Sequence, residues 1–317
     1  MKPLSGTMFV ALWALLAPSF PASLLAQSPS YTRQEDIIYG RKHGTALTLD
    51  KFTPTGKSNG RAAIIVVSGG WFSSHDGVNG FAPVADLLCK RGYTCLAVVH
   101  GSQPRFTIPE AIEDLHLATR FIRSKAKEWN VDPDKLAITG GSAGGHLSLM
   151  MGMQHKPGDP KSGDPVLRQP SGVQAVACFF PPTDFLEWGR PGVMQLGRGK
   201  SAIPGITAPF RFVEFKEGVK EFHDVTDAKK LEKIGKEISP IHNITKDAAP
   251  SLLLHGDQDL LVPLEQAERF VAAMNKANRP AKLDLRKGAG HGWKDMPKDA
   301  ELFADWWEEH LGKPEVK

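Results

Sequence analysis

The chain has 317 residues, of which 41% are hydrophobic and 23% charged, values that exclude a disordered or fibrous protein and allow one large α/β domain or two small ones. The formal net charge of +4 comes from scattered lysines. Because no basic stripe is interleaved with aromatic residues, we do not expect nucleic acid to be a partner.

The first 26 residues have the build of a secretory signal peptide. Lys2 precedes an apolar run over residues 8–17, and Ala26 supplies a small residue before an expected cut ahead of Gln27. The run is short for a membrane span, so an uncleaved anchor is the weaker alternative. We therefore expect a mature chain of residues 27–317 that is secreted or periplasmic and has no stable membrane association.

Strands and helices then alternate along the chain. A hairpin is expected from residues 37–39 and 46–49. Further strands, most of them continuous apolar runs of the kind buried on both faces, are expected at 61–67, 94–99, 136–139, 173–180, 251–254 and 281–285. Helices are expected at about 81–90, 107–122, 143–151, 263–274 and 300–311. This alternation predicts an α/β fold with a mostly parallel sheet covered by helices on both faces.

Residues 185–247 break the alternation. They begin with a glycine-rich part and continue into a charged helical part around 228–238. Roughly sixty residues without a buried strand are uncommon within a compact domain and usually have a function of their own. We therefore expect a cap inserted over the carboxyl edge of the sheet.

The three cysteines offer little chemistry. An exported chain could join Cys89 to Cys95, but both positions also fit an apolar core, and we favour buried free thiols for these two and for Cys178. None of the three has metal-ligand spacing, and the chain has no H-E-x-x-H motif. No metal or cofactor is expected.

The chemistry is concentrated first in the turn between the strand 136–139 and the helix that follows. Residues 140–144 read Gly-Gly-Ser-Ala-Gly and fit G-x-S-x-G, in which a strained turn exposes a serine hydroxyl. Glycine is needed at both ends of the motif because the turn leaves no room for a side chain. Ser142 is therefore the candidate nucleophile, and a plain glycine-rich turn is the alternative. A dinucleotide fingerprint would need glycine in its place.

A serine nucleophile needs a base, and the base needs an orienting acid. The loop after strand 251–254 carries Asp257 and Asp259, and the loop after strand 281–285 carries His291 between glycines. The order Ser, Asp, His is the one an α/β-hydrolase uses. The residues alone do not rank the two aspartates. His146, one helical turn past the serine, is expected to pack in the interior.

Over residues 36–311 the chain resembles the esterase/lipase superfamily of α/β-hydrolases, and within it secreted bacterial feruloyl- and acetyl-esterase-like enzymes. The matching motifs are Gly-Gly-Ser-Ala-Gly-Gly-His at 140–146, His-Gly-Asp-Gln-Asp-x-x-Val-Pro at 255–263 and Gly-His-Gly-Trp at 290–293. The resemblance implies an α/β-hydrolase fold and a triad of Ser142, His291 and Asp259, since the family's acid corresponds to Asp259.

The resemblance also implies an oxyanion hole with two backbone donors. One is the N–H of Ala143. The other is expected from Gly69 or Gly70, where the relatives' His-Gly-Gly-Gly-Trp is replaced by Val-Ser-Gly-Gly-Trp at residues 67–71. Backbone donors survive such changes, although the path of the loop does not follow from the sequence. A glycine-rich hinge without a catalytic role is the alternative.

Aromatic residues near the strand ends, among them Trp71, Phe72 and Trp188, are candidates to line a substrate pocket or, alternatively, to close the core. The function expected from the resemblance is hydrolysis of a small-molecule or carbohydrate ester through an acyl-enzyme. By analogy with the family, the expected reaction is the removal of acyl groups from polysaccharides. Two alternatives stay open: a serine peptidase of the prolyl-oligopeptidase type, and a non-catalytic binding protein on a hydrolase scaffold.

Overall fold

The computed structural model describes residues 29–197, 203 and 205–312. The predicted signal peptide, residues 1–26, lies outside this part of the chain. None of the helices that are described has both the length and the hydropathy of a membrane span.

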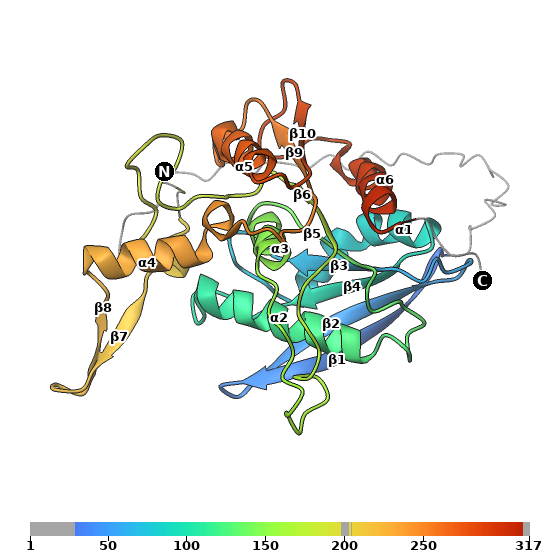
Figure 1. Cartoon of the computed structure of the whole chain (residues 1–317), viewed down its shortest axis with the longest axis horizontal. Coiled ribbons are helices and arrows are strands. Elements are labelled where there is room, and N and C mark those ends of the chain that lie inside the picture. The colour runs from blue at the N-terminus through green and yellow to red at the C-terminus, as the bar shows by residue number, and fades with distance from the viewer. Residues whose placement is uncertain (1–28, 198–202, 204, 313–317) are drawn as a thin grey trace, which may run out of the picture.

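An eight-stranded sheet in the order β1-β2-β4-β3-β5-β6-β9-β10 forms the centre of the molecule (Figure 1). Its strands are β1 (Tyr31–Lys42), β2 (Thr45–Pro54), β3 (Ala62–Val67), β4 (Thr94–Val99), β5 (Leu136–Thr139), β6 (Ala175–Phe179), β9 (Ser251–Gly256) and β10 (Ala281–Arg286). Strand β2 runs antiparallel to β1 and β4, and the other neighbouring pairs are parallel. The predicted mostly parallel sheet is therefore confirmed.

Helices cover both faces of this sheet. They are α1 (Ala82–Lys90), α2 (Ile108–Ser124), α3 (Ala143–Met153), α5 (Leu264–Lys276) and α6 (Ala300–His310). Side chains of α2, α3 and α5 share one hydrophobic core, and those of α1 and α6 share a second. Along β3 the residues alternate between the two cores, with Ile64 in the first and Ile65 in the second. A strand that serves both cores is apolar at every position, which is why its sequence run is continuous.

The observed boundaries differ most from the predicted ones in the first hairpin. Strands β1 and β2 are much longer than the apolar stretches 37–39 and 46–49. The sheet edge explains the difference, because most of β1 is exposed or half-buried and can carry charged residues that give no apolar signal. In contrast, β5 at residues 136–139 has the bounds predicted for it.

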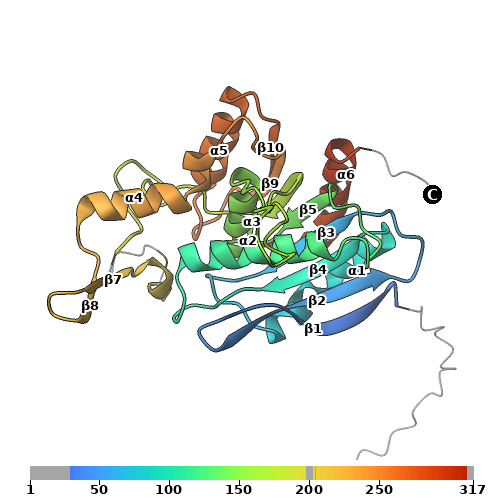
Figure 2. The ribbon, with the colours of Figure 1, turned by 60° about the horizontal axis from the view of Figure 1, so that its bottom comes forward.

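The segment of residues 185–247, called here the cap segment, contributes no strand to the central sheet in its described part. It contains α4 (Ala228–Ile238), the predicted helix, and a separate antiparallel pair, β7 (Val213–Lys216) and β8 (Glu221–Asp224), which was not predicted. In Figures 1 and 2 this hairpin, called here the arm, projects beside α4 and away from the central sheet.

The arm is amphipathic. Phe215 and Phe222 are directly opposite each other across its two strands, with ring centroids 5.1 Å apart, and Phe222 is 73% exposed. On the opposite face, Glu214 forms an ion pair with Lys230 of α4. The arm therefore attaches to the cap through its charged face and leaves its apolar face in solvent.

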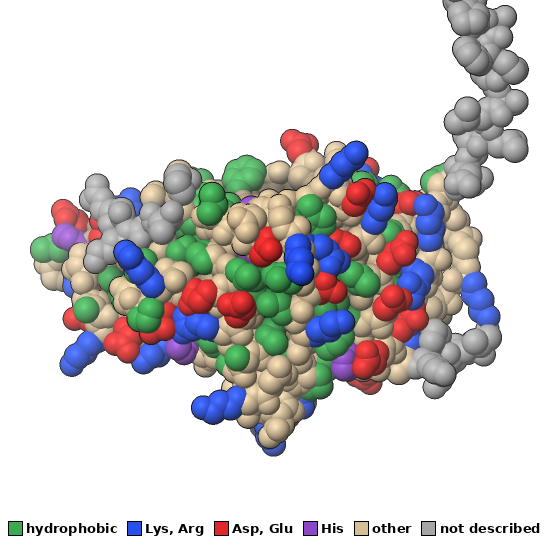
Figure 3. Space-filling model, turned by 90° about the horizontal axis from the view of Figure 1, so that it is seen from above, with side chains coloured by type: hydrophobic (Ala, Val, Ile, Leu, Met, Phe, Trp, Pro, Cys, Tyr) green, Lys and Arg blue, Asp and Glu red, His purple; other side chains and the backbone are tan. Residues whose placement is uncertain are grey.

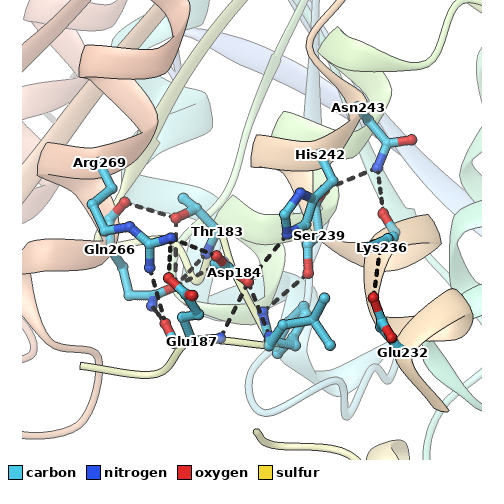
Figure 4. A network of polar contacts seen from close by, with 12 residues as sticks. Thr183, Asp184, Glu187, Glu232, Lys236, Ser239, His242, Asn243, Gln266 and Arg269 are labelled. Carbon is cyan, nitrogen blue, oxygen red and sulfur yellow. Dashed lines mark hydrogen bonds and ion pairs between the residues drawn. The ribbon is translucent and has the colours of Figure 1, made fainter. Parts of the chain in front are cut away.

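The two ends of the cap segment are bonded to each other at a site called here the neck, residues 183–187 and 239–243 (Figure 4). The N–H of Phe185 donates to Ser239 Oγ at 3.0 Å, and the N–H of Ile241 donates to the carbonyl of Thr183 at 3.2 Å. Gln266 of α5 joins them, because its Oε1 accepts from the N–H of Thr183 at 2.9 Å. The cap segment thus leaves and re-enters the domain at one point.

Asp184 is the buried charge of the neck. Its carboxylate accepts from Arg269 of α5 at 2.9 Å and lies 3.5 Å from His242. Burial by itself raises the pKa of this carboxyl, but the hydrogen bonds from His242 and from the N–H of Leu186, together with the charge of Arg269, outweigh it and leave the pKa lowered. Asp184 is therefore ionised at neutral pH and holds both partners in place.

All three cysteines are buried free thiols, with Sγ of Cys89 and Sγ of Cys95 3.9 Å apart. On the face drawn in Figure 3, acidic and basic side chains of the described residues are interspersed, without a large area of one sign.

Candidate active site

The turn between β5 and α3 has the strained geometry expected of a nucleophile elbow. Ser142 has φ +54° and ψ −119°, in the region that a side-chain-bearing residue rarely adopts. A Cβ on Gly140 would lie 2.5 Å from the backbone carbon of Gly144, and one on Gly144 would lie 2.8 Å from the carbonyl of Val66. Both glycines are thus required by close backbone contacts.

Backbone hydrogen bonds fix this turn against the end of β6. The N–H of Ser142 donates to the carbonyl of Phe179 at 3.0 Å, and the N–H of Phe179 donates to the carbonyl of Gly140 at 3.0 Å. The N–H of His146 then donates to the carbonyl of Ser142 at 2.9 Å and begins α3. The N–H of Ala143, the first of the helix, has no hydrogen-bond partner among the described residues and is available to an anion.

On the neighbouring strand ends, His291 and Asp259 form a hydrogen-bonded pair. His291 Nδ1 lies 2.8 Å from Asp259 Oδ2, with the aspartate side chain fully buried and the imidazole 22% exposed. Asp259 Oδ1 accepts from the N–H groups of Leu261 and Val262, each at 2.9 Å. Burial alone would raise the pKa of Asp259, but hydrogen bonds from His255, His291 and Val262 lower it far below the usual range. The carboxylate is therefore ionised and directed at Nδ1 of His291.

The other two candidates in these loops have different contacts. Asp257 Oδ1 accepts from the N–H of Gly288 at 2.7 Å and so joins the loop after β9 to the loop after β10. His255 is fully buried, and its Nε2 lies 2.9 Å from the carbonyl of Val262 within its own turn. The structure therefore brings Asp259, and not Asp257, to His291.

The serine and the histidine are held on the same rim of the sheet. Strands β5, β6, β9 and β10 are parallel neighbours, so their carboxyl ends lie at one edge. Phe180, next after β6, packs its ring 4.3 Å from the imidazole of His291, while the preceding Phe179 carbonyl holds Ser142. No hydrogen bond joins Ser142 Oγ to His291 in the described chain; such contacts often tighten only in the complex with substrate.

The loop after β3 forms a tight turn over residues 69–72. The N–H of Gly69 donates to the carbonyl of Phe72 at 3.0 Å, and the N–H of Phe72 donates back at 2.9 Å. The two central residues, Gly70 and Trp71, have φ of +56° and +59°, and their N–H groups have no partner among the described residues. Gly69 was an expected oxyanion donor, but its N–H is already used within the turn. Gly70 remains a candidate, and the N–H of Trp71 is a further candidate that was not expected from the sequence.

The departure from the relatives' pattern at residues 67–68 is accommodated by a second buried histidine. Ser68 Oγ donates to His100 Nε2 at 2.9 Å, and His100 Nδ1 donates to the carbonyl of Gly101 at 2.9 Å. Burial lowers the pKa of His100 to about 4, so the imidazole is neutral. Sequence analysis did not select His100, although its position directly after the strand 94–99 was the available signal.

Comparison with known proteins identifies the family. The family model described as BD-FAE matches residues 49–274. The chain belongs to the BD-FAE family. LipM of Mycobacterium tuberculosis (strain ATCC 25618 / H37Rv), described as a probable carboxylic ester hydrolase, is 29% identical over 82% of this chain and 56% of its own length. This BD-FAE chain spans only 52% to 60% of the first three curated relatives that it matches.

Solved structures agree on the fold. A truncated carbohydrate esterase from gut microbiota superposes with a TM-score of 0.69 at 24% identity and covers 88% of this chain and 98% of its own. An acetyl ester-xyloside bifunctional hydrolase from Caldicellulosiruptor lactoaceticus gives 0.67 at 21% identity and covers 86% and 95%. The predicted α/β-hydrolase fold, and the resemblance to bacterial acetyl- and carbohydrate esterases, are confirmed.

The aromatic residues that were candidates for a substrate pocket in this BD-FAE chain differ in how deeply they are buried. Trp71 and Trp188 are 2% and 6% exposed and both pack against Phe185, which fits the alternative expectation that they close the core. Phe72 is 54% exposed, and Leu260, next to Asp259, is 98% exposed. The loops after β3 and β9 at this rim thus each expose a large apolar side chain, Phe72 and Leu260.

One group of the described residues in this BD-FAE chain could share a cation. Asp36, Asp50 and His75 place their ligand atoms within 4.8 Å of one another. Arg33 Nη2 already lies 2.6 Å from Asp50 Oδ2 and supplies a positive charge there. The group involves β1 and β2, at the edge of the sheet opposite β10, and has no part in the rim chemistry.

Proposed function

We propose that this protein hydrolyses carboxylic esters through an acyl-enzyme on Ser142, with His291 as general base and Asp259 as the acid that orients it. The observation that carries the proposal is the 2.8 Å contact between His291 and the buried Asp259, on the same rim as the strained Ser142 turn. The family and the ester hydrolases to which the chain is similar support the same reaction.

The tautomer of His291 sets the direction of proton transfer. Because the ionised Asp259 can only accept, Nδ1 of the imidazole carries the proton and Nε2 has the lone pair. As Ser142 Oγ attacks the ester carbonyl carbon, Nε2 takes the hydroxyl proton. Collapse of the tetrahedral intermediate breaks the bond to the alcohol, which leaves with that proton. Water then repeats the sequence on the acyl-enzyme and releases the carboxylic acid.

The oxyanion of both tetrahedral intermediates needs backbone donors. The free N–H of Ala143 lies on the helix side of Ser142, and the free N–H groups of Gly70 and Trp71 lie in the turn after β3. Together they would receive the negative charge at the moment it develops. Each such donor contributes about 3 to 4 kcal/mol to transition-state stabilisation in comparable acyl-transfer sites.

For the substrate we propose an acyl group carried on a polysaccharide. The expected export of the chain, the exposed Phe72 and Leu260 beside the rim, and the carbohydrate-ester hydrolases of the same fold support this class. Export is tested separately by fractionating the producing cells and sequencing the N-terminus of the recovered protein. A start at Gln27 outside the cytoplasm supports a secreted or periplasmic enzyme, and a protein confined to the cytoplasm with Met1 intact overturns it.

The reaction is tested with p-nitrophenyl acetate, acetylated xylan and a proline-ending dipeptide anilide, using Ser142→Ala as the control. We expect release of nitrophenol and acetate by the natural chain, neither by the variant, and no anilide cleavage. Anilide cleavage in place of ester cleavage would indicate the peptidase alternative. Inactivity on all three substrates, together with no labelling by a fluorophosphonate, would indicate a binding protein.

A further inference from the structure

The turn that offers the N–H groups of Gly70 and Trp71 is closed by its own backbone hydrogen bonds, and the Trp71 side chain adds one polar contact. A bulky residue at φ +59° is unfavourable by roughly 1–3 kcal/mol and persists only where its surroundings determine it. The Trp71 ring packs edge-on against Phe185 and Phe210, with centroids 5.7 and 5.0 Å away. Its one hydrogen-bonding group, Nε1–H, donates to His146 Nδ1 at 3.1 Å.

His146 uses both of its ring nitrogens. Its Nε2 lies 2.7 Å from the carbonyl of Ile238, the last residue of α4. A carbonyl only accepts and an indole N–H only donates, so Nε2 of His146 carries the proton and Nδ1 is the acceptor. Burial lowers the pKa of His146 to about 4, against a smaller opposite effect of the Ile238 carbonyl. The imidazole is therefore neutral, in one defined tautomer, and His146 is fully buried.

The position of His146 on α3 gives these contacts a consequence for catalysis. It lies one helical turn after Ser142, and its backbone N–H donates to the carbonyl of Ser142 at 2.9 Å. The same short helix start presents the N–H of Ala143. His146 thus connects the two parts of the proposed oxyanion hole, the start of α3 and the turn at residues 69–72. The carbonyl of Ile238 in the cap segment keeps the proton of the His146 imidazole on Nε2.

We propose that His146 is a positioning residue that fixes the Gly70–Trp71 turn relative to Ala143, and so sets the spacing of the oxyanion donors. This inference rests on the proposed function, because it assigns the turn to the oxyanion. If His146 only filled space in the core, its size would matter and the lone pair on Nδ1 would not. A space-filling role and a positioning role can therefore be separated by replacements that keep the hydrogen-bonding function of one ring nitrogen and remove that of the other.

Asparagine and glutamine make that separation at position 146. In His146→Asn the amide oxygen lies near the place of Nδ1 and can still accept from Trp71, but the contact with Ile238 is lost. In His146→Gln the amide nitrogen lies near the place of Nε2 and can still donate to Ile238, but the acceptor for Trp71 is lost. Each variant is measured for kcat and KM on p-nitrophenyl acetate and for its melting temperature.

We expect His146→Gln to lower kcat at least about tenfold and to change KM by less than about twofold. This loss in kcat is smaller than the roughly 10²–10³-fold loss that follows complete removal of an oxyanion donor in other enzymes. We expect His146→Asn to keep most of the activity. Equal losses in the two variants, or a full kcat in His146→Gln, would overturn the positioning role.

Trp71→Phe provides a second route if either replacement at 146 fails to fold. It removes the indole donor and keeps an aromatic ring against Phe185 and Phe210. We expect a kcat loss similar to that of His146→Gln, and no further loss when the two are combined, since both remove one contact. Additive losses would contradict the proposal.

A readout independent of activity separates this inference from the proposed function. In ¹⁵N-labelled protein the Trp71 indole N–H, assigned by its absence in Trp71→Phe, should shift in His146→Gln and stay nearly in place in His146→Asn. Retention of ester hydrolysis in Ser142→Ala would refute the triad and leave this signature intact. An indole resonance that is unchanged in His146→Gln would refute the contact even in an active triad enzyme.

Discussion

The catalytic rim and the cap segment are built in opposite ways. At the rim, Ser142, Asp259 and His291 each follow a strand of the same parallel sheet within a few residues, so the sheet itself sets their relative positions. In its described part the cap segment has no strand in that sheet, and it is held by polar contacts of Asp184 at the neck and by buried apolar side chains such as Phe210 in the first core. The relative positions of the three rim residues thus follow from the sheet, whereas the position of the cap segment depends on tertiary contacts alone.

The two regions pack against each other through buried side chains. Trp71 of the oxyanion turn packs on Phe185 and Phe210 of the cap segment, and His146 of α3 reaches the carbonyl of Ile238. The cap is therefore more than an external cover, because its inner surface supports the turn that offers oxyanion donors. The following predictions test this contrast, from the largest expected effect to the smallest.

The sharpest test within the rim compares the two acids of one loop. Asp259→Asn keeps the acceptor for Leu261 and Val262 but removes the charge that selects the His291 tautomer, so we expect kcat to fall about 10⁴-fold. Asp257→Asn, two residues away, should cost less than about threefold, because Asp257 only accepts from Gly288. Steady-state kinetics of the two variants on p-nitrophenyl acetate measure this difference in kcat. Comparable losses in both variants would mean that the acid is misassigned.

Acid should lower the free energy of unfolding, because three buried histidines are neutral in the folded protein. Burial lowers the pKa of His100, His116 and His146 to about 4, below the value of 6.5 in an unfolded chain. The unfolded state then binds more protons, so the stability present above pH 6.5 is lost as the pH falls toward 4. We expect roughly 1–2 kcal/mol of unfolding free energy lost per histidine.

Urea titrations at several pH values between 7 and 4.5 measure this dependence. His116→Gln is the matched variant, since His116 contacts Ser171 and Gln154 away from the rim. This variant should reduce the dependence of the unfolding free energy on pH by about the contribution of one histidine. A stability that stays flat over this range would contradict the assignment of these imidazoles as buried and neutral.

The elbow should not tolerate a methyl group. Gly140→Ala places a Cβ 2.5 Å from the backbone of Gly144, so we expect a loss of about 3 kcal/mol in the free energy of unfolding and little activity. Gly163→Ala, at a site where a Cβ meets nothing within 4 Å, serves as the control and should be nearly neutral. Equal melting temperatures for the two variants would show that the turn is not constrained as described.

A buried ion pair at the neck can be compared with an exposed one on α4. Asp184→Asn removes the buried charge that Arg269 and His242 contact, and we expect it to cost about 2 kcal/mol. Glu232→Gln on α4 breaks only the exposed pair with Lys236 and should cost less than about 0.5 kcal/mol. Both residues appear in Figure 4. Differential scanning calorimetry measures both, and a reversed order would refute the neck as the anchor of the cap segment.

The arm should contribute least. Phe222 is 73% exposed, so Phe222→Ser should change the free energy of unfolding by less than about 0.5 kcal/mol and leave kcat unaltered. Phe210→Ser, inside the same segment but fully buried against Trp71, should cost about 3 kcal/mol. Thermal unfolding of both variants gives the comparison. A large loss on changing Phe222 would mean that the arm packs against something in solution.

The sheet and the candidate residues at its rim could be predicted from short local patterns, but the choice of Asp259 over Asp257 came from the family resemblance. The glycines around Ser142 and the acid and histidine directly after apolar strands are signals within a few residues. The oxyanion donor was less predictable. Gly69 and Gly70 are alike in sequence, and only the turn hydrogen bonds show that the N–H of Gly69 is already used.

The cap segment was the least predictable region. Its helix α4 was expected, but the arm was not, because β7 and β8 have four residues each and are mostly exposed. The neck depends on contacts between Asp184 and residues more than fifty positions away, which no local pattern encodes. For the same reason Trp71 and Trp188 gave no sign in the sequence that they pack around Phe185.

The most direct measurement of the central claim is mass-spectrometric mapping of the adduct formed with a fluorophosphonate, with its rate of formation compared in the natural chain, His291→Ala and Asp259→Asn. We predict a single adduct on Ser142, formed at least about 10³-fold more slowly in both variants because the serine loses its oriented base. An adduct on another residue, or an undiminished rate without the imidazole of His291, would contradict the account.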